Sequence, residues 1–141
     1  MTIRTKKINQ QSLKELRSIF KKYPDILAVY LFGSRARGQI HKESDLDLAI
    51  VPKDKTLREK RLDILYDLTR KGFSNVDLVF LDTHDIVLLY EVLRVNHLIY
   101  KKPDFDHGAF YSKIIRQYLD FYPYLEYQRK AYKRRILLDQ T

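Results

Sequence analysis

Two aspartates spaced two residues apart are the first feature of this sequence whose type and spacing suit chemistry. Asp45 and Asp47 stand in the segment Asp-Leu-Asp-Leu-Ala-Ile-Val, which alternates and then becomes wholly apolar, as a β-strand does. Side chains two apart on a strand project from the same face. Neighbouring carboxylates repel one another, and a hard divalent cation with oxygen ligands, such as Mg²⁺, relieves that repulsion. The spacing therefore predicts a metal site.

A third carboxylate, Asp77, stands in the next apolar run, residues 76–81. If this strand neighbours the strand at 45–51, Asp77 converges on the same point. Three carboxylates beside a phosphate site suit two metal ions ~3.5–4 Å apart, which clamp the attacking and leaving oxygens of an in-line displacement. We therefore expect Asp45, Asp47 and Asp77 to be both metal ligands and catalytic residues.

The turn between residues 32 and 45 has the features of a phosphate-binding loop. Gly33 lets the backbone approach a ligand closely, and a short helix starting near Ser34 would point free N–H groups at phosphate oxygens. Arginine pairs with phosphate in bidentate fashion. Among the cations of this turn we single out Arg37 as a candidate phosphate ligand, and we give less weight to Arg35 and Lys42.

The hydrophobic pattern supplies the elements that must position these residues. It predicts strands at about 26–32, 45–51, 76–81 and 98–100, and helices at about 10–22, 56–71, 83–95 and from 104 onward. The resulting fold class is mixed α/β (α+β), a small mixed β-sheet flanked by helices. We expect a single domain over 1–141, with a core at about 10–102 and a C-terminal helical tail at about 104–138.

Several helix ends also have sequence signals. Ser12 with Glu15, Thr56 with Glu59, and Thr83 are expected N-caps, with Asp82 and Asp85 serving the last of these helix starts. Gly72 and Asn96 stand where helices should stop. Pro123 is expected to break the tail into two helices. The second helix is expected to bury four leucines: Leu57, Leu62, Leu65 and Leu68.

Composition narrows the class of protein. The 141 residues contain no cysteine, so thiolate metal sites and disulfides are excluded, and the four histidines lack the spacing of metal ligands. We found no apolar run of membrane-spanning length and no signal-peptide pattern, so we expect a cytoplasmic protein. The net charge of +9 comes from both ends of the chain, while residues 26–109 are neutral overall.

Gly33-Ser34, ten residues, and then Asp45-x-Asp47 resemble the signature of the DNA polymerase β-like nucleotidyltransferase superfamily. The fuller run Phe-Gly-Ser-Arg-Ala-Arg-Gly…Ser-Asp-Leu-Asp-Leu is similar to its minimal nucleotidyltransferase (MNT) branch, over about residues 10–102. The resemblance implies a polymerase β-like fold and an Mg²⁺-dependent enzyme that uses ATP or a related triphosphate. It implies that Gly33 and Ser34 bind the β- and γ-phosphates, that Asp45 and Asp47 hold both metals, and that Asp77 completes the catalytic metal.

The resemblance also implies a partner. Many MNT proteins are antitoxins of paired HEPN–MNT toxin–antitoxin modules, in which the MNT protein adds AMP to a tyrosine of its HEPN ribonuclease partner. We therefore expect a protein adenylyltransferase, with the partner's tyrosine as acceptor. Two alternatives stay open: an antitoxin that neutralises its partner by contact alone, and a nucleotidyltransferase that acts on a small molecule or RNA.

The C-terminal tail allows two interpretations. It holds six of the eleven tyrosines, interleaved with basic residues. Tyrosine and arginine are frequent anchors of protein interfaces, and basic residues among aromatics also bind RNA by stacking and phosphate contact. We rank packing together with a partner interface first and RNA binding second.

Overall fold

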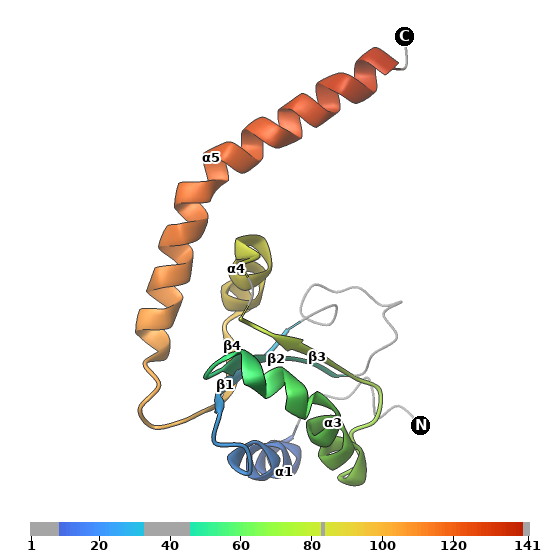
Figure 1. Ribbon diagram of the computed structural model, residues 1–141, viewed down its shortest axis with the longest axis vertical. Helices are drawn as coiled ribbons and strands as arrows, with labels where there is room; N and C mark the ends of the chain where they lie inside the picture. Colours follow the sequence, from blue (N-terminus) through green and yellow to red (C-terminus); the bar gives the residue numbers. More distant parts are fainter. Residues whose placement is uncertain (1–8, 33–45, 83, 140–141) are drawn as a thin grey trace.

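The computed structural model describes residues 9–32, 46–82 and 84–139, and arranges them as a four-stranded sheet with helices on both faces (Figure 1). In chain order the elements are α1 (Gln10–Lys21), β1 (Ile26–Leu31), β2 (Leu46–Pro52), the 3₁₀ helix η2 (Lys55–Lys60), α3 (Arg61–Arg70), β3 (Val76–Phe80), α4 (Ile86–Val95), β4 (His97–Lys101) and α5 (His107–Asp139). The predicted fold class, a mixed sheet flanked by helices, is confirmed.

The sheet has the order β3-β2-β1-β4. β1 pairs antiparallel with both β2 and β4, whereas β2 and β3 are parallel. A parallel pair requires a crossover connection, and η2 and α3 provide it here. The strand that carries Asp77 therefore does neighbour the strand that carries Asp47, as the sequence analysis supposed.

Two hydrophobic clusters lie on opposite faces of the sheet. The first joins α1, η2 and α3 to the alternate residues Leu46, Leu48 and Ile50 of β2. The second joins α4 and the start of α5 to the intervening positions, among them Ala49 and Val51. All seven residues of β2 are buried, since this inner strand is covered on both faces.

The caps of the first two helices differ from those predicted. Asn9, not Ser12, caps α1, and its Oδ1 accepts from the Ser12 backbone N–H at 2.8 Å. Asp54, not Thr56, caps η2, and its Oδ1 accepts from the Thr56 N–H at 3.0 Å. Both predictions were wrong for one reason: an Asn or Asp a few residues upstream is at least as good an acceptor as the Ser or Thr.

The third helix start is partly as predicted. Asp85 caps α4, and its Oδ1 accepts from the Leu88 N–H at 3.2 Å. Because Asp85 is the N-cap, the predicted cap at Thr83 was wrong; Thr83 itself lies outside the described residues. The two expected helix stops are confirmed, since Gly72 has φ +94 and Asn96 has φ 52 and lies in the left-handed region.

The second predicted helix buries a different set of side chains from the one expected. Leu57 and Leu68 are buried and Leu65 is partly buried, but Leu62 is 77% exposed and Ile64 takes its place in the core. Helical phase explains the difference: at about 100° per residue Ile64 and Leu68 lie within about 20° of Leu57, whereas Leu62 lies about 140° away from it. The predicted set of four leucines did not follow that period, and the burial predicted for Leu62 was therefore wrong.

The tail is one helix rather than two. α5 continues through Pro123, so the predicted break is wrong, and the helix instead bends part-way along its length (Figure 1). A proline inside a helix removes one backbone hydrogen bond and kinks the axis without necessarily ending the helix. No helix among the described residues combines the length and apolar character that crossing a membrane requires.

Candidate active site

The site is built on the parallel pair β2–β3. In the register of this ladder the Cα partner of Asp47 is Asp77. Hydrogen-bonded neighbouring strands lie about 4.8 Å apart, and residues in register on them project to the same side. Two carboxylates that are thirty positions apart in the chain are therefore immediate neighbours on one face of the sheet.

Strand alternation shows which face this is. Leu46 and Leu48, on either side of Asp47, belong to the cluster beneath α1 and α3. Val79, two residues after Asp77, packs against the cluster beneath α4 and α5. Both carboxylates therefore stand on the α4 side of the sheet. They lie at the end of that face where β2 begins, because Asp47 is the second residue of β2.

Asp47 is unusual in its burial. It is 4% exposed and is the one polar or charged residue in the buried core of the described chain. Its partner in the ladder, Asp77, is half-buried, so two carboxylates lie close together at this point of the sheet. A buried carboxylate in register with a second carboxylate is the local environment that a bound cation stabilises.

The chain enters the predicted phosphate-binding turn directly beside Asp47. The backbone N–H of Phe32, the last residue described before that turn, donates to the Asp47 carbonyl oxygen at 3.0 Å. Gly33, Ser34, Arg37 and Asp45 all lie outside the described residues, so their roles stay predictions.

The donor set present fits a divalent cation. Asp47 and Asp77 offer carboxylate oxygens, which are the ligands that Mg²⁺ prefers. Among the described residues no group of three or more potential ligands converges, and the third predicted carboxylate, Asp45, lies outside that part of the chain. Two of the three predicted metal ligands are thus brought together by the fold.

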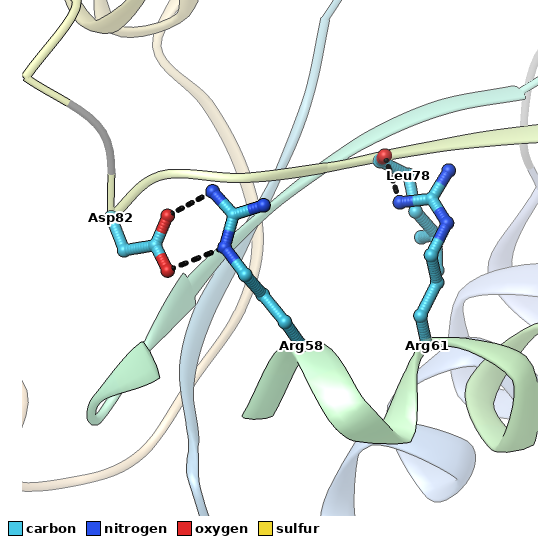
Figure 2. Close-up of polar contacts among 4 residues, drawn as sticks. All are labelled: Arg58, Arg61, Leu78 and Asp82. Carbon is cyan, nitrogen blue, oxygen red and sulfur yellow. Dashed lines mark hydrogen bonds and ion pairs between the residues drawn. The ribbon is translucent and has the colours of Figure 1, made fainter. Parts of the chain in front are cut away.

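Two arginines that sequence reasoning did not single out hold the crossover against β3 (Figure 2). Arg58 of η2 makes a two-point contact with Asp82, with Nε to Oδ2 at 2.9 Å and Nη2 to Oδ1 at 2.5 Å. Its guanidinium also lies over the Phe80 ring, 5.7 Å from the centroid. The hydrogen bond from Arg58 holds the pKa of the Asp82 carboxyl below its usual range.

Arg61 makes the second contact. Its Nη1 donates to the backbone carbonyl of Leu78 at 2.8 Å (Figure 2). β3 is an edge strand, so this carbonyl would otherwise present an acceptor to another chain. Leu78 directly follows Asp77, so Arg61 fixes the backbone next to a candidate catalytic residue.

A comparison with known protein families decides the class of the chain. Residues 14–105 match the family "Polymerase beta, Nucleotidyltransferase". The chain belongs to this family. The match spans all four strands, and so includes both carboxylates of the Asp47–Asp77 pair. The family predicted from the Gly-Ser and Asp-x-Asp motifs is confirmed, and with it the reaction class of a nucleotidyltransferase.

Relatives of this nucleotidyltransferase are consistent with the predicted branch. The chain is 30% identical over 108 residues to the protein adenylyltransferase MntA of Shewanella oneidensis, which covers 77% of this chain and 74% of that protein. The fold is similar to that in a solved toxin–antitoxin structure with AMP-PNP, with TM-score 0.64, 22% identity and coverage of 89% of this chain and 98% of the other. It is equally similar to a chain in the structure of a tri-AMPylated HEPN toxin of Shewanella oneidensis with its MNT antitoxin, with TM-score 0.64, 22% identity and coverage of 91% and 98%.

Proposed function

We propose that this chain is an Mg²⁺-dependent protein adenylyltransferase, which transfers AMP from ATP to a tyrosine of a HEPN-domain ribonuclease and so acts as its antitoxin. The observation that carries the proposal is the pairing of Asp47 with Asp77 in register on one face of the sheet, with Asp47 buried. The kinship with a protein adenylyltransferase, and the fold shared with the antitoxin of an AMPylated toxin, support the choice of donor and acceptor.

Each predicted site residue has a role in this proposal. Gly33, Ser34 and Arg37 bind the triphosphate, and they follow Phe32, whose backbone N–H donates to the Asp47 carbonyl oxygen. Asp45, Asp47 and Asp77 hold two Mg²⁺ ions, whose chemistry is to neutralise negative charge on the attacking and leaving oxygens.

The transfer itself is a displacement at phosphorus. The acceptor hydroxyl oxygen attacks the α-phosphorus of ATP, the bond from that phosphorus to the bridging oxygen of the β-phosphate breaks, and pyrophosphate leaves. The hydroxyl proton passes to a carboxylate, for which Asp77 is the candidate base. Positioning and charge neutralisation supply most of the rate, as in phosphoryl transfer generally.

Intact-mass spectrometry of the HEPN partner tests the proposal. Incubation with this chain, ATP and Mg²⁺ should raise the partner's mass by one or more AMP units on tyrosine. The modified ribonuclease should stay inactive after this chain is removed, because a covalent bond outlasts any complex. A partner that is silenced without a mass change, and that recovers on separation, would contradict catalysis.

That contrary outcome corresponds to the second candidate function, a binding antitoxin. The observation that favours it is the exposed second half of α5, which is a surface suited to contact rather than to chemistry. The buried, in-register carboxylate pair argues against it, since contact alone does not require such a pair.

A further inference from the structure

The side of α5 that packs against α4 continues along the helix beyond the last contact with α4. In the first half of the helix Ile114 is buried against α4, and Tyr118 stacks on Tyr90 with ring centroids 3.7 Å apart and planes 6° from parallel. Leu125 and Tyr132 follow Tyr118 at seven-residue intervals, so they lie on the same side of the helix. Ile136 is one turn further on. We call Leu125, Tyr132 and Ile136 the distal stripe.

Nothing in the described chain covers the distal stripe beyond Leu125. From residue 127 to residue 138 every residue except Ala131 is exposed. After its bend the second half of α5 extends away from the sheet (Figure 1). An apolar stripe at helical spacing that packs a helix over its first half, and continues uncovered, is typical of a surface that packs a further helix.

The charges around the distal stripe indicate what kind of helix would pack on it. Lys133 and Arg135 flank the stripe on its two sides, whereas Lys130 and Arg134 lie on the far side of α5. Glu126 is already paired with Arg129, at 3.1 Å. A second copy of this chain would bring the same cations against these, at a cost in repulsion. The occupant is therefore a different protein with acidic side chains beside an apolar stripe.

A nucleic acid fits this surface less well than a protein helix does. Stacked bases and phosphates require aromatic and basic residues, and α5 has both. The aliphatic side chains of Leu125 and Ile136, however, neither bind phosphates nor stack on bases. They do extend the apolar surface on which another helix can pack. We propose that the distal stripe, flanked by Lys133 and Arg135, docks an acidic amphipathic helix of the HEPN partner. This proposal rests on the proposed function for the identity of the occupant.

Two pairs of matched variants of the full chain test the docking face. The first pair consists of two double variants. One carries Tyr132→Ser and Ile136→Ser, on the stripe. Its control carries Tyr127→Ser and Leu138→Ser, on the opposite side of the helix. Tyr132 and Tyr127 are 60% and 70% exposed, so each double variant removes one exposed tyrosine and one aliphatic side chain, from opposite faces of the helix. Binding to the HEPN partner, titrated without ATP, should weaken at least about tenfold for the stripe variant and less than about twofold for its control.

The second pair separates docking from general attraction. Lys133→Glu with Arg135→Glu reverses the flanking charges, and Lys130→Glu with Arg134→Glu makes the same change in net charge on the far side. The flanking variant should weaken binding at least about tenfold more than the far-side variant. Equal losses in both variants would indicate nonspecific electrostatic attraction, and would overturn the proposal. So would a stripe variant that binds as the parent does.

The same samples, given ATP and Mg²⁺, distinguish failure of docking from failure of the proposed function. If the parent chain binds through the distal stripe but adds no mass to the partner, docking stands and the transferase assignment falls. If AMP is added at the parent's rate by the stripe variant at saturating partner, catalysis stands and only capture has been impaired. A parent chain that does not bind the HEPN protein overturns the docking proposal outright.

Discussion

Asp47 on β2 and Asp77 on β3 are Cα partners in the parallel ladder, and they stand on the face of the sheet that α4 covers. Of the two, Asp47 is buried and Asp77 is half-buried, so the pair runs from the protein interior to its surface. This gradient suits a site in which one carboxylate is fixed and its neighbour faces an incoming substrate.

Asp47→Asn combined with Asp77→Asn should abolish metal-dependent transfer and leave the fold intact. Transfer should fall at least about a hundredfold, since several kcal/mol of charge stabilisation are lost. In metal-free buffer the melting temperature should hold or rise, because a like-charge pair has been removed. Mg²⁺ should raise the melting temperature of the parent and not that of the double variant, as followed by thermal unfolding.

The matched control for that experiment is Asp104→Asn with Asp120→Asn, which removes two exposed carboxylates outside the sheet. This variant should keep both the Mg²⁺ response and the activity of the parent. A double variant at 47 and 77 that still transfers AMP would refute the assignment of these residues.

Gly33→Val should weaken triphosphate binding far more than it weakens folding. A branched side chain at this position obstructs the approach of the backbone to phosphate oxygens. Calorimetric titration with a non-hydrolysable ATP analogue measures the affinity, and thermal unfolding without nucleotide measures the fold. Equal affinity in variant and parent would mean that Gly33 has a structural role alone.

Arg58→Met should lower the stability of the protein at neutral pH, and the loss should fade in acid. In the folded state Arg58 holds the pKa of the Asp82 carboxyl below its unfolded value, which is about 4. A lowered pKa contributes stability that is present above about pH 4 and is lost as the pH falls through the folded value. Urea unfolding of parent and variant at pH 7, 5 and 3 should therefore give a difference in free energy that is the same at pH 7 and 5 and smaller at pH 3.

The control for the pH series is Arg94→Met, which removes an exposed i,i+3 pair with Glu91 on α4. Exposed pairs of this kind contribute little, so its unfolding curves should stay near those of the parent. A difference for Arg58→Met that persists unchanged to pH 3 would show that the effect is packing on Phe80 and not the ion pair.

Pro123→Ala should straighten and stiffen α5. Proline lacks the N–H that would bond the Leu119 carbonyl, and its ring crowds that carbonyl, so alanine restores one helical hydrogen bond. Amide hydrogen exchange around residues 119–127 should slow by at least roughly tenfold. Pro103→Ala, in the turn before α5, is the matched control and should leave exchange in that segment unchanged.

The order of elements and the fold class followed from the sequence because buried strands and amphipathic helices carry strong periodic patterns. The caps at Asn9 and Asp54 did not, because several neighbouring Asn, Asp, Ser and Thr residues compete for each helix start. The exposure of Leu62 follows from helical phase, because Leu62 lies about 140° around the helix from Leu57 while Ile64 and Leu68 share its face. Local patterns locate an element more reliably than they fix its ends.

For the site, the sequence pattern identified Asp77 as a candidate, but its place beside Asp47 was expected only if the two strands were neighbours. The strand order makes them neighbours, and that order depends on long-range pairing and not on local residue types. The contacts of Arg58 with Asp82 and of Arg61 with Leu78 join positions 24 and 17 residues apart, and no motif marks them. The assigned roles of Gly33, Ser34, Arg37 and Asp45 still rest on motif and resemblance.

The parallel pairing of β2 with β3 also determines when the Asp47–Asp77 pair can form during synthesis and folding. β1 and β2 meet as an antiparallel pair, but Asp47 gains its neighbour Asp77 only after the crossover through η2 and α3 has been synthesised and folded. Pairing across such a separation is slow compared with local contacts. A nascent chain that ends before β3 therefore lacks the Asp47–Asp77 pair, and catalytic competence follows the completion of folding rather than its onset.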